Sequence, residues 1–584
     1  MAPHESGFGA SWPPHVLREY ALIADGERGA LIGPRGDFAW MCAPRWDSGA
    51  VFSSLLGGPG GYLVCPATTR FTWGGHYEEG TLIWRSRWVT TTGIIECREA
   101  LAFPGDPHTA VVLRRIVAVD GDAQVQVSLS ADADFGAHPM HQVAHREDVR
   151  MLRAGPLHLR WTGGRGAHLR NGQLETAIEL REGEHHDLVL ELSDRPLREH
   201  LPNPDQLWRQ TEREWHRRVP HMDGTLADRD ARHACAVLTG MTSSSGGMVA
   251  AATTALPERA EQGRNYDYRY CWIRDQCYAG HAAAAAGADS LLDASVAFIA
   301  ERLLDDGPQL KPAYTVGGGR VPDESTLDLP GYPGADAHLG NWVNEQFQLD
   351  SFGEALLLFA AADRVGHLGS EHWKAVEIAT ETIEQRWNEP DAGIWELDNA
   401  EWAHSRLTCA AGLRAISAAA PAAHSVRWDA LADALVADTD TRSLHPSGRW
   451  QRAPGDDRVD AALLLPAIRG GVAADDPRTR LTLDAVRAEL GREGYVYRFR
   501  HRGQPLADAE GAFLLCGFVM ALAEHQQGHH VAAARWFERN RAACGSPALF
   551  TEEFDIVERQ LRGNLPQAFV HALLLESAHR LAIA

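Results

Sequence analysis

The stretch TLIWRSRWVTTTGIIECREALAF, residues 81–103, sets the character of the first third of the chain. It contains two short runs rich in β-branched and aromatic residues, separated by a polar turn that includes Gly93. Such runs favour strands, and the turn between them favours antiparallel pairing. Further runs of the same kind stand at 109–119, 125–130, 157–163, 174–180 and 186–192. We therefore expect an antiparallel β-sandwich, of the super-sandwich type, over residues 1–195.

The pattern changes after a charged connector that contains several prolines. Residues 196–228 read as a linker with one helix, and from residue 229 the apolar residues recur with helical spacing. This spacing predicts twelve helices, at 229–242, 274–287, 289–305, 343–365, 370–387, 404–420, 426–438, 457–468, 478–490, 510–526, 529–543 and 565–582.

The connections between these helices alternate between long and short. Long loops follow the odd-numbered helices, and only a few residues follow the even-numbered ones. In a closed ring of six helical hairpins, alternate connections lie on opposite rims, so the long loops would share one face. We therefore expect an (α/α)6 barrel over residues 229–584, with the functional site on the face that carries the long loops.

Composition excludes several classes of function. A formal net charge of −22 and the lack of a basic stripe argue against nucleic-acid binding. No run of about 18 apolar residues predicts a membrane span. The first residues, MAPHESGFGASWPPH, do not read as an export signal, and nine scattered cysteines fit reduced thiols. We therefore expect a cytoplasmic location, and neither nucleic acid nor membrane as a partner.

The long loops combine aromatic rings with carboxylates. The segment RNYDYRYCWIRDQC, residues 264–277, crowds four rings among alternating charges, and other long loops carry Glu324, Glu396 and the pair Glu552 and Glu553. Aromatic rings pack against the C–H faces of sugars, while arginine and aspartate bind their hydroxyl groups. Two facing carboxylates can protonate a leaving oxygen and activate water. This combination indicates glycoside hydrolysis.

Motifs along most of the chain resemble the inverting, glucoamylase-type glycoside hydrolases of family 15, in the bacterial two-domain form that includes glucodextranases and trehalases. The similar stretches are LIGPRGDFAWMCAPRWDSGAVFSSLL, AATTALPE, RNYDYRYCWIRD, LDLPGYPG, GIWE, EGAFLLC, LFTEEFD and LRGNLPQAFVHALLL. The resemblance also implies a β-sandwich joined to an (α/α)6 barrel.

The same resemblance implies roles for individual residues. Glu396 would be the general acid and Glu552 the general base, with Glu553 as the alternative base. Tyr268 would lie beside the catalytic water. Four further residues would bind the first glucose: Trp272, Arg274, Asp275 and Trp395. We expect no cofactor and no metal, because His525 and His529 have metal-like spacing but lack a third ligand.

The expected activity is inverting, exo-acting hydrolysis of short α-glucosides of the malto- or isomalto-type, with release of β-glucose. A trehalase of the same family, a disaccharide phosphorylase and a catalytically silent glucan-binding protein are the alternatives. The loops ADAHLGN, 335–341, and LDNAEW, 397–402, depart from the family pattern and leave the linkage open. The expected partner is a small oligosaccharide, and the sequence leaves the oligomeric state unknown.

Overall fold

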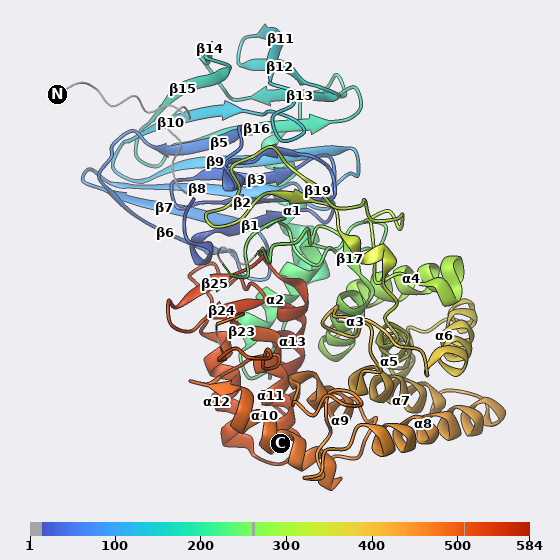
Figure 1. Cartoon of the computed structure of the whole chain (residues 1–584). Helices are drawn as coiled ribbons and strands as arrows, with labels where there is room; N and C mark the ends of the chain where they lie inside the picture. Colours follow the sequence, from blue (N-terminus) through green and yellow to red (C-terminus); the bar gives the residue numbers. More distant parts are fainter. Residues whose placement is uncertain (1–13, 260–262, 507, 584) are drawn as a thin grey trace.

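A computed structural model describes residues 14–259, 263–506 and 508–583, and it divides into a β-rich part and a helical part (Figure 1). The strands of the N-terminal part form two large antiparallel sheets, and the helices that follow form a barrel. The fold class expected from the sequence is confirmed.

The N-terminal part is a sandwich of two eight-stranded sheets. One has the order β1-β2-β3-β5-β10-β15-β14, with β4 paired to β3, and the other has the order β11-β12-β13-β16-β9-β8-β7-β6. The strands are β1 Ala21–Ala24, β2 Gly29–Ile32, β3 Asp37–Cys42, β4 Ala50–Phe52, β5 Gly61–Pro66, β6 Phe71–Tyr77, β7 Trp84–Thr90, β8 Ile94–Leu101, β9 Thr109–Asp120, β10 Ala123–Ser130, β11 His141–Arg146, β12 Val149–Ala154, β13 Leu157–Thr162, β14 His168–Arg170, β15 Gln173–Leu180 and β16 His185–Ser193.

Alternating apolar residues of these strands fill the space between the sheets, as expected for strands with one buried face. Phe38, Tyr62, Trp88 and Trp161 lie in this core, and the Trp161 indole donates a hydrogen bond to the Tyr62 hydroxyl at 3.0 Å. The stretch 81–103 provides β7 and β8, which pair antiparallel in the second sheet.

Thirteen helices of α type lie within the described residues. They are α1 Pro204–Arg218, α2 Asp228–Gly240, α3 Ile273–Ala286, α4 Asp289–Asp306, α5 Asp350–Arg364, α6 Trp373–Arg386, α7 Ala403–Ser417, α8 Ala422–Arg442, α9 Leu465–Ile468, α10 Pro477–Leu490, α11 Leu514–Gln526, α12 His530–Arg541 and α13 Ala568–Arg580. Helix α1 packs on the sandwich, where Trp215 stacks on Phe103 with ring centroids 4.1 Å apart. Each of the other twelve overlaps one of the twelve helices expected from the sequence.

Six helices form the inner ring of the barrel, and each contacts the next: α3, α5, α7, α9, α11, α13 and then α3 again. Helices α4, α8 and α12 pack on the outside of this ring, and α2 packs on α13. Inner helices are apolar almost all round, whereas α8, α10 and α12 bury one face. This is the ring of six hairpins that the loop lengths indicated.

The long connections lead from each outer helix to the start of the next inner helix, so they gather at one end of the barrel. They span 241–272, 307–349, 387–402, 443–464, 491–513 and 542–567. Several contain short strands, including β17 Cys271–Trp272, β18 Ala313–Tyr314, β19 Ser325–Thr326, β20 His338–Leu339, β21 Gly491–Arg492, β22 Tyr495–Val496, β23 Ala512–Phe513, β24 Glu553–Asp555 and β25 Gln560–Arg562.

The sandwich lies against this end of the barrel (Figure 1). Trp40 of β3 donates through its indole nitrogen to the carbonyl of Ala252 at 2.8 Å, which ties the first sheet to the loop 241–272. One hydrophobic core continues from the sheet into the helices. Among the described residues, no helix combines the length and the apolar character needed to cross a membrane.

Candidate active site

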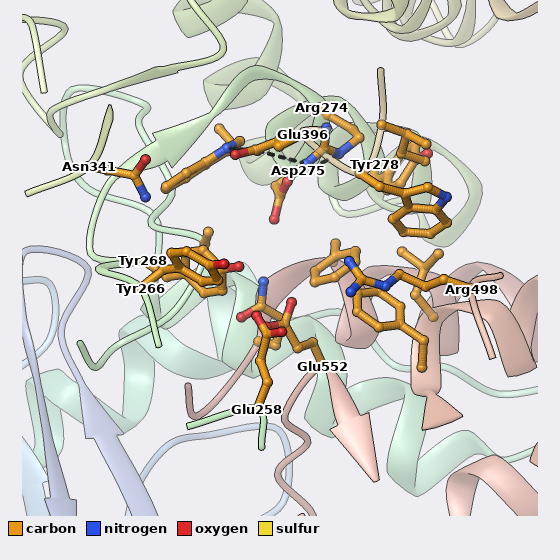
Figure 2. Close-up of a pocket in the computed structure, with 18 of the residues that line it drawn as sticks. Glu258, Tyr266, Tyr268, Arg274, Asp275, Tyr278, Asn341, Glu396, Arg498 and Glu552 are labelled. Carbon is orange, nitrogen blue, oxygen red and sulfur yellow. Dashed lines mark hydrogen bonds and ion pairs between the residues drawn. The ribbon is translucent and has the colours of Figure 1, made fainter. Parts of the chain in front are cut away.

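A pocket opens among the starts of the inner helices, and side chains from five of the long loops line it (Figure 2). The residues expected from the sequence meet here. Among the lining residues are Glu258, Arg264, Tyr266, Tyr268 and Trp272 from 241–272, Arg274, Asp275 and Tyr278 from α3, Asn341 and Trp342 from 307–349, Trp395 and Glu396 from 387–402, Arg498 and Phe513 from 491–513, and Glu552 and Gln567 from 542–567.

Glu396 stands at the end of a tight turn, where its backbone amide donates to the carbonyl of Gly393 at 3.2 Å. Its φ of 54° lies in the left-handed region, which is uncommon outside glycine. The Trp272 indole donates to Glu396 Oε1 at 2.6 Å, and the Arg274 guanidinium lies 3.5 Å from the same oxygen. Two donors therefore orient this carboxyl group at the pocket wall.

Arg274 and Asp275 lie in the first turn of α3, and both are buried. Arg274 donates to Gln348 Oε1 at 3.2 Å. Burial raises the pKa of Asp275 to about 6, although the neighbouring guanidinium of Arg274 opposes this shift. The Asp275 carboxyl points into the pocket (Figure 2). A charged pair in this position can bind the hydroxyl groups of a sugar.

Aromatic rings form the remaining wall. Tyr268 and Trp272 meet edge to face with centroids 5.4 Å apart, and Tyr266 stacks on Tyr268 at 6.1 Å. The Trp395 indole donates to Asp460 Oδ1 at 2.8 Å, so the sixth long loop, 443–464, also supports the site. Burial and the nearby Glu552 carboxyl raise the pKa of Tyr268 well above its usual value. Its hydroxyl therefore stays protonated and can donate a hydrogen bond.

The two adjacent glutamates of LFTEEFD face different surroundings. Glu552 lines the pocket, and its buried Oε1 has no hydrogen-bond partner among the described residues. Glu553, in β24, turns the other way, and its Oε2 accepts a hydrogen bond from the Gly511 amide at 2.7 Å. This opposition follows from the alternation of side chains along an extended backbone. Geometry thus favours Glu552 over Glu553 for contact with a substrate.

Four charged residues near Glu552 were not assigned a role by the sequence analysis: Glu258, Arg264, Arg498 and Glu510. Arg264 Nε donates to Glu258 Oε2 at 2.8 Å, and Arg498 donates to Glu510. Although burial works against it, Arg498 and His501 hold the pKa of Glu510 at about 2. Glu258 is the last residue of the motif AATTALPE, and Glu510 is the first residue of EGAFLLC. The presence of an acidic residue in each of these two motifs was the signal in the sequence that could have identified them as site residues.

Other residues considered in the sequence lie elsewhere. Glu324 is exposed and outside the pocket, and Tyr270 is buried behind the wall. Of the two departing loops, ADAHLGN contributes Asn341 to the pocket lining and LDNAEW contributes none of the described lining residues. Within the described ranges, no group of three or more His, Cys, Asp or Glu side chains is arranged to hold a metal ion.

Two family models cover the chain. The model of glycosyl hydrolases family 15 matches residues 232–579, and a trehalase-like N-terminal model matches residues 8–215. The first match spans more than half of the 584 residues. The chain belongs to glycosyl hydrolases family 15. As a glycosidase of this family, it carries the pocket at the barrel rim where the long loops converge.

Alignments with similar proteins cover nearly the whole chain of this family 15 member. It is 29% identical to a trehalase of Mycobacterium tuberculosis, with 97% of this chain and 89% of the relative covered. It is also 29% identical to a trehalase of Mycolicibacterium smegmatis, over 97% and 91%. Among solved structures, a bacterial glucoamylase complexed with acarbose matches with a TM-score of 0.73 at 13% identity, over 98% of this chain and 95% of that chain. The structural match extends the fold to both domains.

Proposed function

We propose that this family 15 glycosidase hydrolyses the α-glucosidic bond of α,α-trehalose with inversion at the attacked anomeric carbon. The observation that carries the reaction type is the position of Glu396 and Glu552 on opposite sides of one pocket, with the Asp275 carboxyl between them (Figure 2). Inverting hydrolysis needs an acid on one side of the bond and a base on the other.

In this mechanism Glu396 donates a proton to the glycosidic oxygen as the bond to the anomeric carbon breaks. Glu552 removes a proton from the water that attacks the opposite face, so the new C–O bond has the inverted configuration. Arg274 and Asp275 would hold the hydroxyl groups of the attacked glucose, and Tyr268, Trp272 and Trp395 would pack around its ring. Solvent then removes the proton from Glu552 and returns one to Glu396.

Trehalose as the substrate is supported by the relatives. Both mycobacterial proteins align over 97% of this chain and carry the name trehalase. The N-terminal region also matches a trehalase-like domain model. The sequence alone favoured malto- or isomalto-glucosides, which differ from trehalose in the hydroxyl group through which the leaving glucose is linked. Because these similar proteins are named trehalases, we propose trehalose as the substrate instead.

The decisive experiment is proton NMR of fresh products combined with a substrate panel. Inverting hydrolysis of trehalose should release equal amounts of β-glucose and α-glucose, because the attacked ring inverts and the leaving ring keeps its configuration. Specificity constants for trehalose, maltose, isomaltose, kojibiose, nigerose and soluble starch should be highest for trehalose.

Three outcomes would contradict parts of the proposal. An initial signal from α-glucose alone would exclude inversion. A higher specificity constant for maltose or isomaltose would restore the glucosidase expected from the sequence. Cleavage that requires phosphate and yields glucose 1-phosphate would identify a phosphorylase, which uses phosphate in place of activated water.

A further inference from the structure

A second carboxyl group lies beside the proposed base. Glu258, from the loop 241–272, lines the pocket next to Glu552, and the two carboxyl groups appear together in Figure 2. Both side chains are buried. Gly563 lies against both, since a Cβ placed there would meet Glu552 at 3.4 Å and Glu258 at 3.8 Å. The negative charge of a neighbouring carboxylate makes a buried carboxyl group harder to ionise.

Near these two carboxyl groups, buried acidic side chains outnumber the arginines that pair with them. Arg264 forms an ion pair with Glu258 at 2.8 Å and lies 3.5 Å from Glu510. Arg498 forms an ion pair with Glu510 and lies 4.0 Å from Glu553. Two guanidinium groups therefore face four buried glutamates. The titratable groups around Glu552 come from every neighbouring segment: Glu258, Arg264, Tyr266 and Tyr268 from 241–272, Arg498, His501 and Glu510 from 491–513, Glu553 from its own strand, and Glu396 across the pocket.

We infer that Glu258 is a positioning residue for the general base: its carboxyl group lies against the Glu552 carboxyl, fixes it at the pocket wall and makes it a stronger base. This inference rests on the proposed function, in which Glu552 activates water. Glu258 acts through Glu552 and need not touch the water itself. The proton that Glu552 takes from water leaves to solvent.

The pairing has a chemical consequence for the base. Burial and then the adjacent Glu258 and Glu553 carboxylates raise the pKa of Glu552 well above its usual value. A carboxylate with a raised pKa is a stronger general base at neutral pH. At low pH Glu552 is protonated, and it becomes available as a base only as that proton is lost. The pH at which the acidic limb of activity lies therefore depends on the charge of Glu258 beside Glu552.

The test is the pH dependence of kcat/KM for the Glu258→Gln enzyme. Glutamine keeps the size and can still donate a hydrogen bond, but it removes the adjacent charge. We expect the acidic limb to move to lower pH by about one unit. The rate constant at the optimum should fall by about tenfold, because the base becomes weaker. Glu258→Asp withdraws the carboxyl by one bond and should move the limb in the same direction by a smaller amount, which provides a second test if the glutamine variant does not fold.

Glu524→Gln is the matched control. Glu524 is equally buried and is bound by Arg487 at 2.7 and 2.9 Å, but it lies outside the pocket lining. Its replacement should lower the melting temperature without moving the acidic limb. An unchanged limb in the folded Glu258 variants would overturn the inference and leave a purely structural role. A wild-type protein that cleaves no α-glucoside would instead refute the proposed function.

Discussion

The backbone of Glu396 shows how a single residue is fixed for chemistry. A left-handed φ costs a non-glycine residue about 1–2 kcal/mol, so surrounding contacts must hold it. Here the turn beginning at Gly393 and the two donors on Oε1 provide these contacts. The strained conformation points the carboxyl toward the pocket, where an extended backbone would direct it elsewhere. We regard this strain as support for Glu396 as the proposed acid.

A comparison of the two adjacent glutamates tests the assignment of the base. Glu552→Gln removes the carboxylate that lines the pocket and should lower kcat/KM by about 10²–10⁴-fold. Glu553→Gln keeps an acceptor for the Gly511 amide and should lower it by less than about tenfold. Steady-state kinetics of both variants, with melting curves as a control for folding, provide the measurement. A larger loss in the Glu553 variant would assign the base to that residue.

The elements show which parts of the fold periodicity can predict. Each of the twelve expected helices overlaps one in the structure, and most bury an apolar face several turns long. The helix expected at 457–468 is the exception, since only Leu465–Ile468 is α-helical, after a 3-10 turn at Ala461–Leu464. The predicted first residues of the helices at the site rim were less accurate. The helix expected from 343 begins at Asp350, and the helix expected from 510 begins at Leu514. In both cases the residues that were expected to be helical, but precede the helix, contribute to the site. Gln348 binds Arg274, and β23 pairs with β24 beside Glu552.

The same limit applies to the site residues. Trp272, Arg274, Asp275, Trp395, Glu396 and Glu552 could be named in advance because each lies in a short motif that resembles a family. Glu258 was not named, although it ends the motif AATTALPE, because its importance comes from Glu552, which lies more than 200 residues away in the chain. Long-range pairing of charges leaves no periodic signal in a single sequence.

Helix α5 carries a buried carboxylate that makes its stability depend on pH. Asp350 is fully buried in the first turn, and neither oxygen has a hydrogen-bond partner among the described residues. Burial raises the pKa of Asp350 to about 6. The folded state therefore binds this proton more tightly than the unfolded state, so its contribution to stability is present at low pH and is lost as the pH rises from about 4 to about 6.

Asp350→Asn should remove this loss. The quantity to compare is the free energy of unfolding of the variant minus that of the wild type. This difference should be about 2 kcal/mol larger at pH 7.5 than at pH 4.5. Urea denaturation at the two pH values measures the difference. Asp228→Asn, which removes an exposed carboxylate from the first turn of α2, controls for the loss of a helix-start charge and should show no comparable growth. Equal gains at both pH values would show that Asp350 is not the titrating group.

At the scale of the whole molecule, the sandwich supports the loop that carries much of the site. Arg269, next to Tyr268, donates to the carbonyl of Ser48 at 2.8 Å and contacts Cys42 of β3 at 3.4 Å. It also binds Asp267 through two hydrogen bonds, and Asp267 accepts from the Gly340 amide at 3.0 Å. One buried guanidinium thus connects the first sheet with two loops of the barrel rim. The position of the pocket wall depends on both domains.

Replacing this arginine should disturb catalysis as well as stability. Arg269→Met leaves the buried Asp267 carboxylate without its partner, which costs about 3–5 kcal/mol. Because Tyr268 directly precedes Arg269 and lines the pocket, we expect kcat to fall by at least about tenfold in the fraction that remains folded. Arg160→Met is the matched control, since Arg160 forms a buried pair with Glu191 of the sandwich and otherwise donates to the carbonyls of Arg198 and His200 in the connector, away from the pocket lining. It should lower the melting temperature while kcat per folded molecule stays normal. Kinetics below both melting transitions separate the two effects, and a normal kcat in Arg269→Met would mean that the barrel positions Tyr268 without help from the sandwich.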